Sequence, residues 1–291
     1  MRFISYLTIA VTCFFRWLVP VQAFMQGMSV RSSIRSREIR STDNKEAVDL
    51  FTTCVAIDSP EVSRFEADAG YVVEKKWFLD AARKLQFVVK KQKFSFDHGR
   101  IIYTSLRKYL EKADNDKPLN LIDVGTARGF SALCAAKALE DTGVSHARVI
   151  TIDPLSHFER IEWVTIDRID SGVLGLHSRA DLISPWSQLF SKYVIFLQGY
   201  SKIVLPSLQL DRINFAFIDG MHDYSSVYFE FEYIAKRQIN GDLVVFDDFD
   251  RENFPGLVKA VQEIAHQYQY SLTEINGYQS RNYMIAIKVS N

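Results

Sequence analysis

Cysteine is scarce in this chain and is never spaced for metal binding or redox chemistry. The 291 residues include three cysteines, Cys13, Cys54 and Cys134. No C-x-x-C motif occurs, which excludes a cysteine zinc knuckle, and three scattered thiols do not make a disulfide framework. Cys134 lies on the apolar face of an expected helix, so we predict that it belongs to the core.

An excess of charge of either sign is also missing. Lys+Arg and Asp+Glu are equal at 35 each, and no basic stripe with interleaved aromatic residues stands out. We therefore expect no nucleic-acid partner. Hydrophobic residues make up 47% of the chain and aromatic residues 13%, which is enough for one sizeable α/β core with room for an N-terminal extension.

The N-terminal leader has the composition of a targeting segment. A basic start and an apolar run of signal-peptide length fill residues 1–15, and Val21 and Ala23 fit a cleavage site. A membrane anchor over residues 3–23 is the alternative, but Arg16 and Pro20 interrupt the apolar run, which is shorter than the roughly 20 residues of a spanning helix. We expect the signal to direct the chain into the secretory route, with no stable membrane span in the mature form.

The stretch after the cleavage site is rich in Ser, Arg and Met. Glu38 is the only acidic residue between Phe24 and Ser41. A signal followed by such a stretch resembles the bipartite plastid-targeting leaders of algae with complex plastids, and a disordered basic linker is the other interpretation. We therefore exclude residues 1–43 from the fold.

The remainder divides into an N-terminal helical extension, residues 44–118, and an α/β domain, residues 119–291. Helices are expected at 101–110, 130–139, 203–208, 225–238 and 257–268, and strands at 119–124, 148–152, 194–197, 213–218, 243–246, 271–275 and 282–289. Right-handed crossovers then give a doubly wound, Rossmann-like, seven-stranded and mostly parallel sheet with an antiparallel C-terminal strand.

Two of the expected strands end in acidic residues. Asp219 follows the first of them and Asp247-Asp248 follow the second, with His222 close behind Asp219. Ligands of open α/β sheets bind at this edge, and like charges gathered there are costly unless a cation or a proton relieves them. The pattern favours a metal site. A capping pair and an ordinary loop histidine remain the alternatives, and for Asp97, His98 and Asp250 we expect surface loops.

A glycine-containing turn joins the first strand to the next helix. Asp123, Gly125 and Gly129 stand in the sequence DVGTARGFS, which lets the backbone approach a ligand next to a helix N-terminus. The G-x-x-x-G spacing is neither the G-x-G-x-x-G of dinucleotide enzymes nor a P-loop. A nicotinamide dehydrogenase is therefore disfavoured.

The next two strands also end in residues suited to a nucleoside. Asp153 can accept two hydrogen bonds from a ribose diol, although an Asp after a strand is often a helix cap. Gly199-Tyr200-Ser201 is an opening of small residues with a hydroxyl. Each signal is weak alone, but together they lie in register across successive strands.

Taken together, these motifs resemble a class I S-adenosylmethionine-dependent methyltransferase. Within that class the chain is similar to the cation-dependent O-methyltransferases related to catechol O-methyltransferase and to the sugar O-methyltransferases of macrolide biosynthesis. The resemblance covers residues 119–289. It is carried by five motifs in the family's order: Asp123-x-Gly125-x-x-x-Gly129-x-Ser131, Val149-Ile-Thr-Ile-Asp153-Pro154, Gly199-Tyr-Ser201, Ile218-Asp-Gly-x-His222-x-Tyr224 and Val245-Phe-Asp-Asp248.

The resemblance implies a role for each motif. It implies Mg²⁺ or a similar divalent cation held by Asp219, Asp247 and Asp248, with His222 as the general base. Two departures stand out: Ala127 replaces the middle glycine of the general pattern, and residues 157–185 have no counterpart that aligns. The implied S-adenosylmethionine site comprises Asp123, Gly125, Thr126, Gly129, Ser131, Asp153, Tyr200, Ser201 and Asp219.

The expected activity is methyl transfer from S-adenosylmethionine to a hydroxyl oxygen of a small molecule, a sugar or a phenol, with assistance from Mg²⁺. The alternatives are a non-catalytic S-adenosylmethionine-binding module, or a metal-dependent hydroxylase or hydrolase on the same fold, because fold alone does not decide chemistry. A homo-oligomer is left open.

Overall fold

The computed structural model describes residues 51–53, 55, 59–86, 95–114, 117–162, 176–277 and 281–290. All of them belong to one unit, Thr42–Asn291. The interpretations of the leader fall on residues 1–43, outside the described residues, so cleavage, anchoring and plastid targeting stay predictions. Among the described helices none combines the length and the apolarity that a membrane crossing requires.

A seven-stranded sheet organises the described part of the chain, in the order β5-β2-β1-β6-β7-β9-β8. The pairs among β5, β2, β1, β6 and β7 are parallel, whereas β9 runs antiparallel to both β7 and β8. The predicted Rossmann-like sheet is therefore confirmed. Its strands are β1 Leu119–Val124, β2 Ala147–Asp153, β5 Val194–Gln198, β6 Phe215–Ile218, β7 Leu243–Phe246, β8 Tyr270–Asn276 and β9 Asn282–Lys288.

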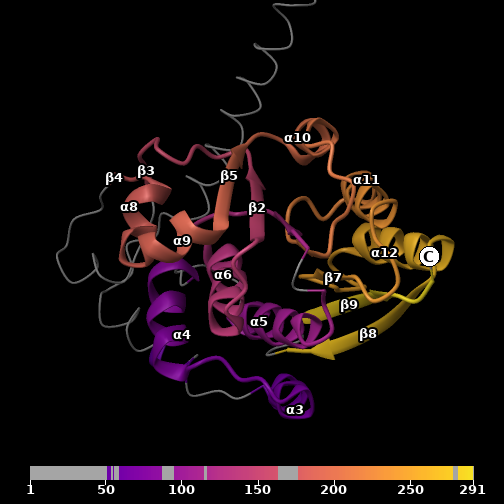
Figure 1. Cartoon of the computed structure of the whole chain (residues 1–291), viewed down its shortest axis with the longest axis horizontal. Helices are drawn as coiled ribbons and strands as arrows, with labels where there is room; N and C mark the ends of the chain where they lie inside the picture. Colours follow the sequence, from indigo (N-terminus) through magenta and orange to yellow (C-terminus); the bar gives the residue numbers. More distant parts are fainter. Residues whose placement is uncertain are drawn as a thin grey trace, which may run out of the picture. The chain divides into compact units, whose positions relative to one another are not determined.

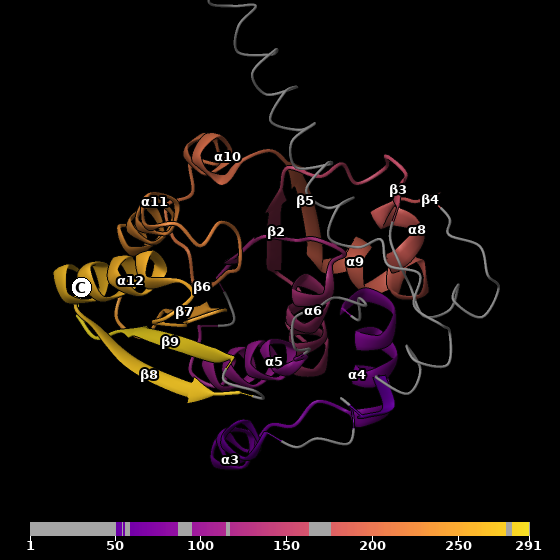
Figure 2. The same cartoon turned by 180° about the vertical axis from the view of Figure 1, so that it is seen from behind.

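Helices cover the sheet in two groups (Figures 1 and 2). In Figure 1, α10, α11 and α12 lie together on one side of the strands, and α4, α5, α6 and α9 lie on the other. This arrangement follows from strands that are apolar on both faces and need cover on each. The helices are α3 Pro60–Ala69, α4 Lys75–Ala81, α5 Asp97–Leu110, α6 Phe130–Thr142, α8 Arg179–Ile183, α9 Ser187–Tyr193, α10 Ser201–Ser207, α11 Tyr224–Ala235 and α12 Pro255–Gln267.

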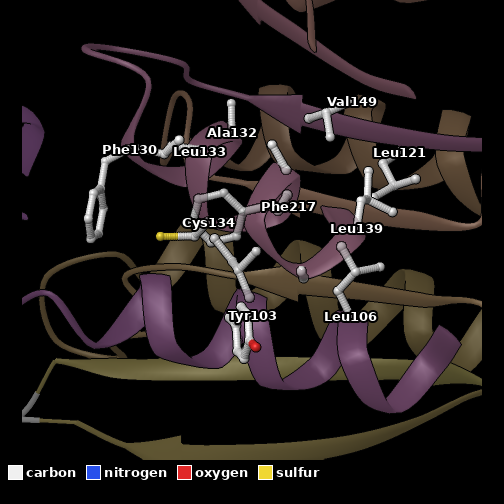
Figure 3. Packing of buried hydrophobic residues seen from close by; sticks show 14 of the residues in the cluster. Tyr103, Leu106, Leu121, Phe130, Ala132, Leu133, Cys134, Leu139, Val149 and Phe217 are labelled. Carbon is white, nitrogen blue, oxygen red and sulfur yellow. The ribbon is translucent and has the colours of Figure 1, made fainter. Parts of the chain in front are cut away.

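Two hydrophobic clusters fill the space between the helices and the sheet. On the α5 and α6 side, Tyr103 and Leu106 of α5 pack beneath Cys134 and Leu139 of α6, next to Phe217 of β6 (Figure 3). Cys134 is fully buried and free, as expected from its place on an apolar helix face. The N-terminal helical layer is thereby joined to the same core as the sheet.

The described part of the N-terminal helical extension is divided into separate helices. Helix α3 ends at Gly70, which adopts a left-handed φ of +80°, and α4 begins after Glu74, whose side chain accepts hydrogen bonds from two backbone amides. A π-helical turn, Ala82–Gln86, follows α4. Ser59 is the N-cap residue of α3, but its hydroxyl donates to Asp97 of α5 at 2.5 Å instead of capping α3.

The stretch after β2 carries two short strands, β3 Ile161–Glu162 and β4 Leu176–His177, which pair antiparallel. Helix α8 follows, begun by a capping box in which Ser178 and Asp181 bond each other's backbone amides. This segment supplies Arg179, which reaches back to the main sheet edge. The boundaries of the three predicted domains stay predictions.

Candidate active site

The carboxyl ends of β1 and β6 meet so closely that only a glycine fits between them. Gly125 follows β1 with φ +99°, and a Cβ at this position would stand 2.1 Å from the carbonyl oxygen of Asp219. Backbone hydrogen bonds fix the approach, since the amide of Asp219 donates to the carbonyl of Val124 at 2.9 Å. The glycine turn and the first acidic residue are therefore parts of one rigid edge.

Helix α6 begins within the same turn. Gly129 is its N-cap and has a left-handed φ of +99°, and no side chain caps the helix. Ala127 also has positive φ, +43°, which explains why a glycine is the usual residue at this position of the pattern. The open N-terminus of α6 suits an anionic or polar group of a ligand.

A chain of hydroxyl groups ties the turn to the strands below it. Thr151 donates its only hydroxyl proton to Asp123 at 2.5 Å, so Thr126 must donate to the oxygen of Thr151. Burial raises the pKa of Asp123 to about 6, against the effect of its hydrogen bond from Thr151. The side chains of Asp123, Thr126 and Ser131 are all buried, so they support the turn from beneath.

Asp153, the predicted ribose residue, is held by several donors. One oxygen accepts from the Leu155 amide at 2.6 Å and lies 3.3 Å from Nη2 of Arg179, and the other accepts from the Ala127 amide at 2.9 Å. Arg179 is buried and also donates from Nε to the carbonyl of Ala127 at 2.6 Å. The carboxylate therefore fastens α8 and the glycine turn together, and its role toward a ribose stays a prediction.

Tyr200 and Ser201 stand at the start of α10, at the carboxyl end of β5. Both are half-buried, and the Ser201 hydroxyl donates to Oε1 of Glu230 at 2.5 Å. Glu230 lies on α11, is 1% exposed, and has no hydrogen-bond partner for Oε2. Burial raises the pKa of Glu230 to about 7. Because Ser201 gives its proton to Glu230, its oxygen can only accept a hydrogen bond from a ligand.

Three of the predicted catalytic and metal residues lie together. Ligand atoms of Asp219, His222 and Asp248 all lie within 4.8 Å of one another. Nε2 of His222 is 3.3 Å from Oδ2 of Asp248 and 3.9 Å from Oδ1 of Asp219. Burial, followed by the charges of Asp247 and Asp248, raises the pKa of Asp219 well above its ordinary value. Two carboxylates and an imidazole can hold a divalent cation or move a proton between them.

Asp247 is placed differently from the other predicted metal residues. It is fully buried, and Arg281 grips both of its oxygens, from Nε at 3.0 Å and from Nη2 at 2.5 Å. Its own Oδ1 also accepts from the Asp248 amide at 2.7 Å. Despite burial, the charge of Arg281 holds the pKa of Asp247 down at about 2. The structure thus groups Asp247 with an arginine, and Asp248 with His222.

The expectation of surface loops for Asp97 and His98 is wrong. Both begin helix α5 and are buried, at 7% and 2% exposure, because the helical layer packs this end of α5 against the sheet. The His98 ring stacks on Phe217 with centroids 5.9 Å apart, and its Nδ1 lies 3.9 Å from Asp247. Asp250 instead accepts backbone hydrogen bonds in a turn, in line with the prediction for it.

Four residues of this edge were not singled out from the sequence: Arg179, Glu230, Arg281 and, as a buried group, His98. For Glu230, the sequence does contain a pattern that could have singled it out. It falls among Val227, Phe231 and Ile234, so a carboxylate occupies the apolar face of a helix. The other three give no local signal because their partners are distant in the sequence.

Comparison with known proteins agrees with this geometry. Residues 122–249 match the family model of a methyltransferase domain. No curated protein matches the chain. The match spans the glycine turn, Asp153, the acidic strand ends and the histidine between them.

Solved structures of methyltransferases share the fold. The O-methyltransferase TomG from Streptomyces achromogenes, involved in tomaymycin synthesis and solved in complex with SAM, has 16% identity and a TM-score of 0.50, over 75% of this chain and 92% of TomG. The O-methyltransferase NovP has 17% identity and a TM-score of 0.52, over 72% of this chain and 87% of NovP.

The seven-stranded sheet of this chain has the fold of these two methyltransferases. Residues 122–249 therefore match a methyltransferase domain, and the fold is the one expected from the resemblance of the motifs. The roles of the individual site residues stay predictions.

Proposed function

We propose that the chain transfers a methyl group from S-adenosylmethionine to a hydroxyl oxygen of a small molecule, a sugar or a phenol, with a divalent cation assisting. The observation that carries the proposal is the grouping of Asp219, His222 and Asp248 at the same sheet edge as the Gly125 turn. That edge offers a cofactor turn and an acid–base group side by side. The names of TomG and NovP as O-methyltransferases are in line with an oxygen acceptor.

The proposed reaction requires that the acceptor oxygen be aligned with the methyl group and that this oxygen lose its proton. Methyl transfer from a sulfonium is an in-line displacement, and a sugar or phenol hydroxyl is mostly protonated at neutral pH. In the proposed mechanism, the imidazole of His222 takes the hydroxyl proton, and the carboxylate of Asp248, whose Oδ2 lies 3.3 Å from Nε2, stabilises the imidazolium. The backbone of Gly125 and the open N-terminus of α6 receive the methionine end of the cofactor.

The donor set fits a divalent cation. Asp219 and Asp248 offer carboxylate oxygens within 4.8 Å of each other, and Mg²⁺ prefers oxygen ligands with retained waters. A bound cation would lower the pKa of the acceptor hydroxyl. Asp247 is left out of this set, because Arg281 already bonds both of its oxygens. His222 lies beside the two carboxylates, where it can act on the substrate.

Binding and turnover test the proposal separately. Isothermal titration with S-adenosylhomocysteine should show one site per chain, and NAD under the same conditions should give no heat. Labelled S-adenosylmethionine, offered with a panel of sugar and phenol acceptors in Mg²⁺ and in EDTA, should yield a labelled ether only with metal. Binding without transfer to any acceptor would support the binding-module alternative, and binding of NAD instead would reject the proposal.

The leader is part of the proposal as well. We propose that residues 1–23 direct the chain into the secretory route and that residues 24–41 carry it on to a plastid. A fluorescent protein fused behind residue 43 should reach the plastid with the whole leader and stop in the secretory route when residues 24–41 are deleted. Retention in membranes after carbonate washing would favour the anchor alternative.

A further inference from the structure

Arg281 contacts both of the aspartates that follow β7. Its guanidinium makes a fork on Asp247, with Nε 3.0 Å from Oδ1 and Nη2 2.5 Å from Oδ2, and Nε is also 3.1 Å from Oδ1 of Asp248. The side chain of Arg281 is 17% exposed, and that of Asp247 is fully buried. A bidentate contact between a planar guanidinium and a buried carboxylate is a strong, directional interaction.

Among the described residues, Arg281 makes closer contacts to Asp247 than the other basic side chain that faces it. Nδ1 of His98 lies 3.9 Å from Oδ2 of Asp247, beyond hydrogen-bond distance, whereas Nη2 of Arg281 lies 2.5 Å from that oxygen. Tyr283, which lies on β9 close to Arg281, exchanges a hydrogen bond with Ser95 at 3.0 Å. The charge of Asp247 is therefore balanced by Arg281.

Arg281 also sets the position of the neighbouring aspartate. Asp248 has a left-handed φ of +52°, an uncommon conformation for a residue with a side chain. One of its oxygens is 3.1 Å from Arg281, and the other is 3.3 Å from His222. Asp248 thus lies between the guanidinium and the imidazole. Its Oδ1 contacts Arg281, so its Oδ2 faces His222.

We propose that Arg281 is a positioning residue whose guanidinium supplies the positive charge next to Asp247 and Asp248. Its positive charge neutralises Asp247, as a divalent cation would otherwise do. Its contact with Oδ1 of Asp248 leaves Oδ2 of Asp248 facing His222. The fold at this edge of the sheet is therefore stable without metal. Any cation that assists the acceptor hydroxyl is held by Asp219 and Asp248 only. The inference deepens the proposed function and rests on it only in taking this edge as the active site.

Thermal unfolding with and without metal tests the inference. Wild type, Arg281→Met and Arg281→Lys are melted in EDTA and in Mg²⁺ or Mn²⁺ at several concentrations. Without Arg281, Asp247 and Asp248 repel each other and a cation relieves them, so the melting temperature of R281M should rise by about 5 °C or more on adding metal, and that of wild type by about 2 °C or less. Lysine keeps the charge, so R281K should respond as weakly as wild type.

Two further variants separate charge balance from loss of packing. Arg251→Met removes an exposed bidentate pair, Arg251 with Glu274 at 2.9 and 2.7 Å, and should leave the metal response of wild type unchanged. The double variant Arg281→Met with Asp247→Asn removes both charges and should return the weak response of wild type. The double variant also keeps the test available if R281M alone does not fold.

Catalysis supplies a second readout. Lysine cannot form the fork that orients Asp248, so R281K should lower kcat about tenfold or more while S-adenosylhomocysteine affinity stays unchanged. An equal loss of melting temperature in R281M with and without metal, or full kcat in R281K, would overturn the inference. Failure of wild type to bind S-adenosylhomocysteine would instead reject the proposed function, since the melting experiments use no cofactor.

Discussion

Gly125 and the carbonyl oxygen of Asp219 leave no room for a side chain between them, since a Cβ on Gly125 would lie 2.1 Å from that oxygen. The two residues stand 94 positions apart in the sequence, at the ends of the neighbouring parallel strands β1 and β6. The glycine turn and the acidic edge are thus held at a fixed separation by backbone contact.

A methyl group at position 125 should therefore disrupt both parts of the site. We expect Gly125→Ala to lower the free energy of unfolding by about 2–5 kcal/mol, from backbone strain at positive φ and from overpacking against Asp219. Gly143→Ala is the matched control, because Gly143 has φ +77° with nothing within 4 Å of a Cβ. Chemical denaturation of both variants measures the difference, and equal losses would show that the contact with Asp219 is unimportant.

The two aspartates that follow β6 and β7 should respond in opposite directions when neutralised. Asp247→Asn removes the buried carboxylate that Arg281 bonds with two nitrogens, leaves Asp248 as its remaining charge partner, and should cost about 3–5 kcal/mol. Asp219→Asn removes a carboxylate whose pKa is raised by burial and by neighbouring negative charge, so metal-free stability should stay level or rise. Denaturation in EDTA at pH 7.5 checks both, and a large loss in Asp219→Asn would make that residue a structural cap.

The strands could be predicted closely because each is a short apolar run between polar residues. Leu119–Val124 and Leu243–Phe246 were predicted with their observed ends, and the other strands of the main sheet differ by two residues or fewer at either end. Continuous burial on both faces of the parallel strands produces this signal directly. The same regularity placed the glycine turn and the acidic residues at one edge.

The different partners of Asp247 and Asp248 at that edge could not be predicted from the sequence. Asp247 and Asp248 are adjacent and chemically identical, and a residue pointing inward differs from its neighbour only by the geometry of the strand end. Which of the two is neutralised depends on Arg281, 34 residues away in the β8–β9 hairpin. Arg179 likewise reaches Asp153 from a segment that has no counterpart in the family pattern.

His222 should matter for turnover and little for the cofactor. Its Nε2 lies 3.3 Å from Asp248, where it can accept the acceptor proton, and general-base help of this kind is typically worth about 10²–10⁴-fold. His222→Ala should lower kcat by that order with S-adenosylmethionine affinity nearly unchanged. Steady-state kinetics and titration of one preparation measure both.

An acidic phenol offers the control for that experiment. A phenol with a low pKa needs no base, so His222→Ala should lose much less activity on it than on an aliphatic hydroxyl. Full activity of the variant on the aliphatic substrate would reduce His222 to a loop residue packed on Phe254, with ring centroids 4.5 Å apart.

Glu230 should make the stability of the protein depend on pH. Burial raises its folded pKa to about 7 from an ordinary 4.5, so the folded state binds this proton more tightly than the unfolded state does. Its contribution is fully present below pH 4.5 and is lost as the pH rises through about 7. The shift corresponds to about 3 kcal/mol, because each pKa unit is worth about 1.4 kcal/mol.

Glu230→Gln isolates this contribution, because glutamine keeps an oxygen to accept the Ser201 hydroxyl but cannot ionise. The variant should unfold with nearly the free energy of wild type at pH 4.5 and should be more stable by about 3 kcal/mol at pH 8. Glu263→Gln, which changes an exposed carboxyl on the neighbouring helix α12, should follow wild type across the range. Parallel curves for wild type and Glu230→Gln from pH 4.5 to 8 would mean that Glu230 is charged and paired in the folded protein, and that the unpartnered Oε2 has a donor in solution.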